Sequence, residues 1–379
     1  MGGGGVPVAR ILGIEIRVSF AWAVLVALIT VIGAQQATIG SPTIPPVAQW
    51  VIGVGVAMLF LASVIAHELA HALVGRRRGV PTTVIALGFI GGLAPLAIQA
   101  PRARDELVIA LVGPAVSIVL AALLVGAGIL LGTLAPASAP IAGGILVVGL
   151  LNLILGVISL VPAMPLDGGR VVRAVAWGRS GDRDQATRVT AKFGRLVGWT
   201  IMGVGVALAL AEFVTEGLIA IALGWLLNTG ARTVERRLGL EQLLRGLKVG
   251  EAMQRDVPFV GPGLTIDTFA ARFEGPDAVA AMPVVEDDIV VGVLGRKGLV
   301  RLGRRRFGGT RVDEVMAVPP RAPVLAPDDA LWDAVELLNE AGLDGLAVAE
   351  GGHLAGLVTR DGLADAIRTH AAARAATGG

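Results

Sequence analysis

The sequence predicts a polytopic α-helical membrane domain followed by a soluble α/β module. Composition is the first indication: of the 379 residues, 54% are hydrophobic and 16% are charged, whereas a typical soluble domain has about 25% charged residues. Charged residues are sparse from about residue 18 to residue 230 and ordinary in number afterwards. The last third also contains an internal repeat with a period of about 63 residues, which suits two copies of a small α/β unit.

Apolar segments predict about six transmembrane helices, because each is close to the ~20 residues that cross a bilayer. They lie at residues 18–36, 50–75, 105–133, 141–165, 195–212 and 215–231. The last two segments could instead form one re-entrant pair. Residues 8–19 alternate between apolar and polar side chains, which predicts a short pair of strands before the first span.

The distribution of basic residues predicts the orientation of the chain. The connections at 37–49 and 134–140 carry no charge. When the chain is threaded six times through the membrane, the basic connections all fall on the opposite side, which is the cytoplasmic one. Their basic residues are Arg76, Arg77, Arg78, Arg102, Arg104, Arg170, Arg173, Arg179, Arg183, Arg188, Lys192, Arg195, Arg232, Arg236 and Arg237. We therefore expect a multi-pass protein of the plasma or inner membrane with both termini in the cytoplasm.

The strongest chemical signal is His67-Glu68-Leu69-Ala70-His71, which ends the second apolar segment. On a helix the two histidines lie on one face, one turn apart, as a zinc ion requires. Glu68 falls beside them, where it can take a proton from water. Ionisable groups are costly inside a membrane, so they mark a functional site by default. A chance match that caps a helix is the alternative interpretation.

The third zinc ligand must be a carboxylate, because the chain has no cysteine and only the two histidines of this motif precede residue 230. Asp167 is the best candidate, since it is the only acid from residue 107 to residue 181. It follows two prolines in the segment 162–165, which would unwind the end of the fourth span. Gly168 and Gly169 permit a tight turn beside it. The alternative is an ordinary turn at the membrane surface.

The connection between the second and third spans is unusual. Residues 82–98 are apolar and β-branched and contain Gly88, Gly91 and Gly92. The segment is too short to cross the membrane twice, so it predicts a membrane-dipping hairpin or re-entrant loop. An open strand edge there, with Gly91 and Gly92, would bind an extended substrate. A hydrophobic connector without function is the alternative.

Residues 8–230 resemble the site-2 protease family. The resemblance rests on the histidine motif, the glycines at 88–92, Gly113-Pro114 in the third span, and the segment from Pro162 to Gly169. It implies an intramembrane zinc metalloendopeptidase, which cuts a transmembrane segment of a membrane-anchored protein such as an anti-sigma factor.

The same resemblance implies a role for each motif residue. His67, His71 and Asp167 would bind one Zn²⁺, and Glu68 would be the catalytic base. The family commonly has an asparagine eight residues before the zinc aspartate, where this chain has Ser159. Asn152 lies two helical turns earlier on the same face. Ser159 and Asn152 are therefore candidates for binding the substrate, or else polar residues satisfied within the helix bundle.

The C-terminal repeat resembles a pair of cystathionine-β-synthase (CBS) domains. Val249-Gly-Glu-Ala-Met253 recurs as Val312-Asp-Glu-Val-Met316, and residues 292–299 recur as residues 356–363. The resemblance implies a module that regulates the enzyme and can form a homodimer.

The nucleotide pattern of CBS domains is incomplete in this repeat. The second copy offers Thr359 and Asp361, although the family's aspartate stands one residue later, and the first copy has Gly295 in place of the threonine. An adenine nucleotide at Thr359 and Asp361 is therefore a candidate ligand. A basic run at 301–306 would meet phosphate or anionic lipid, or else form a solvated loop.

The sequence thus predicts a transmembrane metalloprotease domain at 1–232, a linker at 233–248, CBS domains at 249–310 and 311–370, and a disordered tail at 371–379. The expected partners are the lipid bilayer and a transmembrane protein substrate, and a net charge of +2 does not favour nucleic acid. Two other functions stay open: a CBS-regulated channel or transporter, and a non-catalytic membrane chaperone that binds the metal.

Overall fold

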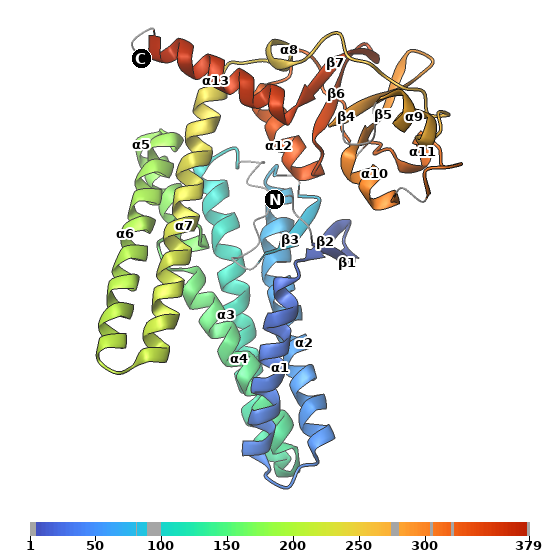
Figure 1. Cartoon of the computed structure of the whole chain (residues 1–379). Helices are drawn as coiled ribbons and strands as arrows, with labels where there is room; N and C mark the ends of the chain where they lie inside the picture. The colour runs from blue at the N-terminus through green and yellow to red at the C-terminus, as the bar shows by residue number, and fades with distance from the viewer. Residues whose placement is uncertain are drawn as a thin grey trace. The chain divides into compact units, whose positions relative to one another are not determined.

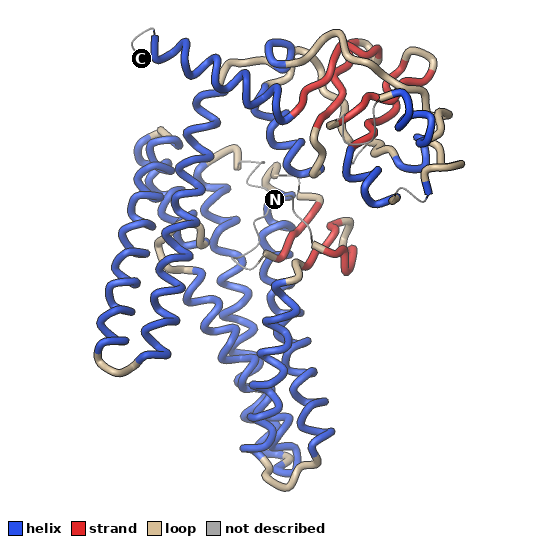
Figure 2. Tube along the Cα trace, in the orientation of Figure 1, coloured by secondary structure: helices blue, strands red, loops and turns tan. Residues whose placement is uncertain are grey.

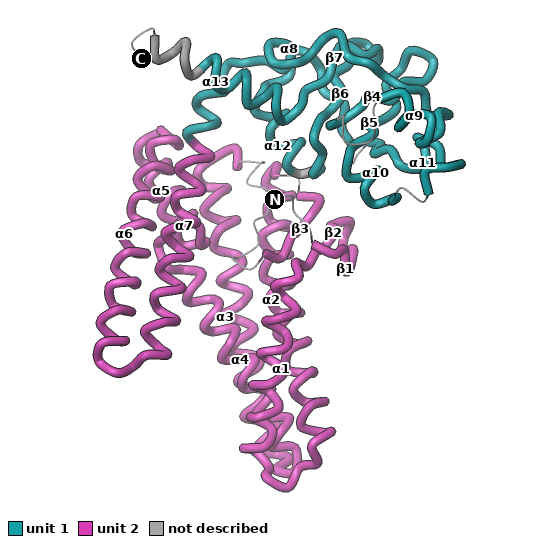
Figure 3. Tube along the Cα trace, viewed as in Figure 1, with its two compact units in different colours: residues 1–3, 239–379 teal, residues 4–238 magenta. Residues whose placement is uncertain are grey.

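The structure is a computed structural model, and it describes residues 5–80, 82–88, 100–273, 280–303, 306–319 and 322–376. The chain forms two compact units, which Figure 3 colours separately. We call residues 4–238 the membrane unit and residues 239–379 the soluble unit.

Long apolar helices dominate the membrane unit (Figure 1). Six helices of the described residues are long and apolar enough to cross a membrane: α1 (Ala21–Gly40), α2 (Pro46–Arg77), α3 (Ala103–Leu134), α4 (Ala139–Ser159, preceded by the 3-10 turn η1, Pro136–Ser138), α6 (Arg183–Leu210) and α7 (Val214–Leu244). Large apolar side chains point outward from them, such as Leu123 and Trp225, which are 64% and 61% exposed. The protein is therefore a polytopic membrane protein, and the last two apolar segments are separate long helices.

The membrane unit also contains a small sheet, whose strands are among those drawn in red in Figure 2. The strands β1 (Val6–Ile11) and β2 (Ile14–Val18) form the predicted antiparallel pair, and β3 (Val84–Leu87) joins β2 in parallel. The sheet has the order β1-β2-β3, and the side chains of Ile16 and Ile85 pack on α1 and α2 in one apolar core. The segment predicted to dip into the membrane thus begins as the third strand, whereas residues 89–99 lie outside the described residues.

The fourth span ends earlier than the sequence predicts. α4 stops at Ser159, residues 160–166 form turns, and a separate helix, α5 (Asp167–Ser180), starts at the candidate ligand. The prolines between α4 and α5 lack the backbone N–H that would continue the helix. Several arginines expected in a loop therefore lie on α5, which ends at Ser180 and is followed by Gly181 with a φ of 73°.

The soluble unit contains the two copies of the repeat. The first copy contains α8 (Val249–Ala252), α9 (Ile266–Arg272), β4 (Ala281–Glu286), β5 (Ile289–Gly295) and α10 (Arg296–Leu302). The second contains α11 (Val312–Val315), α12 (Leu331–Ala341), β6 (Gly345–Glu350), β7 (His353–Thr359) and α13 (Arg360–Ala376). Their strands form one sheet of order β4-β5-β7-β6. Each copy also has one isolated parallel bridge, between Val260 and Val284 in the first and between Leu325 and Val348 in the second.

The edges of the soluble unit differ from the predicted boundaries in two places. α7 continues to Leu244, within the predicted linker, because Leu240 and Leu244 pack in the core of the soluble unit. α13 continues to Ala376, within the predicted tail.

Candidate metal centre

Three side chains meet where α2 and the start of α5 come together. His67 and His71 lie one turn apart on α2, and their Nε2 atoms are 3.2 Å apart. The Oδ2 atom of Asp167 lies 3.4 Å from the Nε2 of His67 and 3.3 Å from that of His71. The structure thus brings together the three residues that the sequence predicts as ligands.

The spacing of these three atoms fits a tetrahedral zinc ion. Zinc lies about 2.0–2.2 Å from nitrogen and oxygen ligands, and a tetrahedron's edge is about 1.63 times that distance, so ligand atoms should lie about 3.3–3.6 Å apart. The observed separations of 3.2, 3.3 and 3.4 Å match this edge closely. Two imidazoles and a carboxylate are also a donor set that zinc accepts, and three ligands leave one corner for water.

The outer nitrogens of both histidines are held by α3. The Nδ1 of His71 donates a hydrogen bond to the backbone oxygen of Ile109 over 2.6 Å. The Nδ1 of His67 lies 2.8 Å from the hydroxyl oxygen of Ser117, which is fully buried. A carbonyl oxygen can only accept, so a neutral His71 carries its proton on Nδ1 and leaves the lone pair of Nε2 available for a metal ion.

Asp167 is in a setting that favours its ionised form. Burial by itself raises the pKa of this carboxyl group, but hydrogen bonds from His67 and His71, which need a proton on Nε2 when no metal is bound, outweigh that effect and hold the pKa below its usual range. As the first residue of α5, the carboxylate also lies at the helix end where negative charge is stabilised. The group is therefore suited to bind a cation as an anion.

The α3 backbone lies directly against the imidazoles at Gly113. A Cβ atom at this position would stand 2.1 Å from the Nε2 of His71 and 2.7 Å from that of His67. No side chain fits there without displacing a candidate ligand. Together with Glu106, Ile109 and Ser117, Gly113 lies on one face of α3, because the spacing of three, four and four residues repeats the helical turn.

Gly168 and Gly169 are needed for close packing and not for the predicted tight turn. Neither has a positive φ, and both belong to the first turn of α5. A Cβ at Gly168 would lie 2.2 Å from the backbone oxygen of Leu160, and one at Gly169 would lie 2.5 Å from the backbone nitrogen of Met164. The glycines allow close packing of α5 on the preceding turns, and that packing places Asp167.

The other predicted site residues of the membrane unit are not among the three side chains that meet at the candidate metal centre. Glu68 is half-buried on α2 beside His67. Asn152 and Ser159 are both buried in α4; the amide nitrogen of Asn152 donates to the backbone oxygen of Val148 over 2.9 Å. Gly91 and Gly92 lie outside the described residues.

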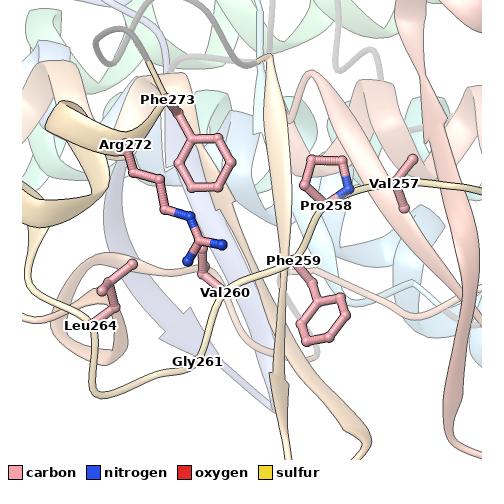
Figure 4. Close-up of a pocket in the computed structure, with 8 residues that line it drawn as sticks. All are labelled: Val257, Pro258, Phe259, Val260, Gly261, Leu264, Arg272 and Phe273. Carbon is pink, nitrogen blue, oxygen red and sulfur yellow. The ribbon is translucent and has the colours of Figure 1, made fainter.

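The residues predicted to bind nucleotide lie at the junction of β7 and α13. Thr359 is buried, and its hydroxyl oxygen accepts a hydrogen bond from the backbone N–H of Gly362 over 3.1 Å, while Asp361 is exposed. Neither lines the cavity of about 440 Å³ that Figure 4 shows in the first copy. That cavity has an apolar lining with one cation, Arg272, whose guanidinium lies 5.6 Å from the ring centre of Phe273.

Sequence reasoning missed the charged residues that surround Asp167. Glu106 on α3 is 2% exposed, and both the Nε and the Nη2 of Arg173 donate to its Oε1 atom. The sequence offered Arg170 and Arg173 only as markers of topology. The sequence did contain one indication of this role: Glu106 is an acid at the start of an apolar helix, on the same helical face as Gly113 and Ser117.

Comparison with known proteins agrees with both parts of the chain. The model of Peptidase family M50 matches residues 55–140, and the model of the CBS domain matches residues 249–304 and 312–369. These ranges include the histidine motif, the α3 face and both copies of the repeat.

Two similar proteins extend over most of the chain. Rip3 of Mycobacterium tuberculosis, which is named as a zinc metalloprotease, is 34% identical over 377 residues that cover 96% of this chain and 92% of Rip3. Zinc metalloprotease MJ0392 of Methanocaldococcus jannaschii is 28% identical over 307 residues, 80% of this chain and 82% of that protein. Among solved structures, the site-2 protease from Methanocaldococcus jannaschii is 24% identical, covers 62% of this chain and 96% of its own, and has a TM-score of 0.41.

Proposed function

The chain belongs to peptidase family M50, the site-2 protease family, and is a membrane-embedded zinc metalloprotease; on this premise we propose that it cleaves a transmembrane segment of a membrane-anchored protein. Regulated intramembrane proteolysis, for example of an anti-sigma factor, is the cellular process that such a cleavage would serve. The observation that carries the proposal is the tetrahedral spacing of three donor atoms within an apolar helix bundle.

The zinc ion would be held by His67, His71 and Asp167. When bound, zinc supplies a Lewis acid that polarises a carbonyl group and lowers the pKa of water. Glu68 takes the proton from the attacking water and returns it to the leaving amine. Ser117 and the backbone oxygen of Ile109 keep the imidazoles oriented, and the apolar helices around them limit access of bulk water.

The substrate must be extended where it is cut, because the carbonyl group of a helical peptide bond is hydrogen-bonded and crowded. β3 supports a place for such a segment: it pairs with β2 on one side and is an edge strand of the described sheet. An edge strand can accept an extended peptide through backbone hydrogen bonds. We assign the segment that follows β3 in the sequence, with Gly91 and Gly92, to substrate binding, and Asn152 and Ser159 to its support.

The decisive experiment compares E68Q with D167N in the purified full chain, with a reconstituted transmembrane substrate and metal analysis. E68Q should keep one zinc per chain and lose cleavage, because the base is removed and the ligands remain. D167N should lose both zinc and cleavage, because a carboxylate ligand becomes a neutral amide. The matched control is E216Q, since Glu216 is an exposed acid at the start of α7.

Substantial cleavage by E68Q would exclude Glu68 as the base. A wild-type enzyme that binds zinc and cleaves no transmembrane segment would support a membrane chaperone instead. Family membership already favours a protease over a channel or transporter.

The soluble unit would regulate the enzyme and not catalyse, because the candidate ligands and base all precede residue 170. We assign its two copies, 249–310 and 311–370, to effector binding and to dimerisation, and residues 1–232 to catalysis. An adenine nucleotide at Thr359 and Asp361 is the proposed effector. Both termini would be cytoplasmic, in accordance with the basic connections.

A further inference from the structure

Four charged side chains of alternating sign connect α3 and α5, and the series begins at the candidate ligand Asp167. Asp167, Arg170 and Arg173 follow one another along α5, and Glu106 faces them from the first turn of α3. The Oδ1 atom of Asp167 lies 3.8 Å from the Nη1 of Arg170, and the Nε of Arg170 lies 3.9 Å from the Oε1 of Glu106. Glu106 in turn accepts hydrogen bonds from Arg173.

The two arginines have different tasks in this chain of charges. Glu106 and Arg173 are both buried, and a buried carboxylate is costly unless a cation hydrogen-bonds to it. Arg173 meets that need through two donors on one oxygen. Neutralising Glu106 therefore does not require Arg170, whose Nε is buried without a hydrogen-bond partner among the described residues.

The two oxygens of Asp167 face different neighbours. Oδ2 faces both imidazoles, at 3.4 and 3.3 Å, and Oδ1 faces Arg170. A cation beside Oδ1 attracts that oxygen and leaves Oδ2 turned towards the histidines. Arg170 is itself attracted to Glu106, which Arg173 holds against α5.

We propose that Arg170 is a positioning residue that orients Asp167 as a one-oxygen zinc ligand, and that the Glu106–Arg173 pair holds Arg170 in place. The inference rests on the proposed role of Asp167 as a ligand. It gives a function to the buried ion pair of Glu106 and Arg173, which reaches Asp167 through Arg170.

Two other roles for Arg170 predict different results. A guanidinium group repels a nearby zinc ion, so if Arg170 were only a neighbouring charge, removing it would tighten zinc binding. If Arg170 only tied α5 to α3, removing it would lower the melting temperature and leave the zinc affinity of the folded protein unchanged. Only the positioning role predicts that folded R170Q binds zinc more weakly than the wild type.

The test measures the zinc dissociation constant of the full chain in detergent by competition with a chromophoric chelator. The absorption spectrum of the Co²⁺-substituted protein reports the coordination geometry independently of activity. For R170Q we expect zinc affinity to fall about 10- to 100-fold, the usual loss when an outer partner of a metal ligand is removed, together with a changed Co²⁺ spectrum. R179Q is the matched control, because Arg179 is exposed on the same helix.

A second variant protects the test from misfolding. E106Q/R173Q removes both buried charges together, so that neither stays unpaired. Because Arg170 then loses its anchor, we expect a zinc affinity lowered in the same direction as in R170Q. The triple variant R170Q/E106Q/R173Q should lose less zinc-binding free energy than R170Q and E106Q/R173Q lose when their separate losses are added, because all three residues act on Asp167 through Arg170.

Zinc affinity equal to or tighter than that of the wild type, in folded R170Q or folded E106Q/R173Q, would overturn the inference. D167N separates this failure from failure of the proposed function. If D167N weakens zinc binding and R170Q does not, only the positioning role is wrong. If D167N also binds zinc normally, Asp167 is no ligand and both proposals are wrong.

Discussion

Replacing Gly113 by alanine should destroy the metal centre although it adds only a methyl group. The new Cβ would lie 2.1 Å from the Nε2 of His71, about 1.3 Å closer than the 3.4 Å at which ordinary contacts begin. The neighbour cannot easily give way, because the ring of His71 is hydrogen-bonded to the backbone of the same helix at Ile109. A shift of about 1 Å far exceeds the roughly ±0.2 Å that a metal–ligand distance tolerates.

We therefore expect G113A to lower zinc affinity by at least about 100-fold, the upper end of the loss seen when only an outer partner is changed. The helix itself gains up to about 1 kcal/mol, because alanine is a better helix former than glycine. The assay measures zinc content, the zinc dissociation constant and cleavage of a reconstituted transmembrane substrate, with circular dichroism to verify helix content.

G126A is the matched control, since Gly126 lies on the same helix and a Cβ there would meet nothing within 4 Å. This variant should bind zinc and cleave like the wild type. A G113A protein with wild-type zinc affinity and cleavage would show that α3 does not lie against the imidazoles, and the described centre would be wrong.

Other predictions test the surroundings of the site and the second unit. S117A should weaken zinc binding about 10- to 100-fold by releasing His67, whereas S63A should not, because the hydroxyl of Ser63 donates to the backbone oxygen of Phe60 on its own helix. An alkaline phosphatase fused to the C-terminus should stay inactive in cells, and one inserted in the connection 135–138 should be active, or the predicted topology is wrong. Calorimetry of the full chain should detect AMP binding that D361N weakens at least about 10-fold; no heat with any adenine nucleotide would leave dimerisation as the role of the soluble unit.

Local patterns in the sequence predict those parts of the structure that depend on few distant contacts. His67 and His71 are a helical turn apart, so their proximity follows from α2 alone. The strand pair β1–β2 follows from alternation over adjacent residues. Asp167 could be predicted because an isolated acid is conspicuous in an apolar region.

The parts that the sequence does not predict depend on pairing between distant segments. The arginines of α5 are typical of a cytoplasmic loop, so the sequence gives no indication that this segment is a helix that packs on α3. Parallel pairing of β3 with β2 joins residues about 70 positions apart, and no local pattern encodes it. Ser117 looks like an ordinary polar residue in a membrane helix until His67 lies beside it.

The metal centre depends most on a helix that supplies no ligand. From one face, α3 accepts a hydrogen bond from His71 at Ile109, contacts both imidazoles at Gly113, and meets the outer nitrogen of His67 at Ser117. From the same face, Glu106 holds the helix that carries Asp167. Two candidate ligands on α2 and one on α5 can thus be oriented by a single element, and we expect a shift of α3 to alter all three at once. The His-Glu-x-x-His motif therefore indicates zinc, whereas the spacing of four residues on α3 sets the orientation of the side chains proposed to bind it.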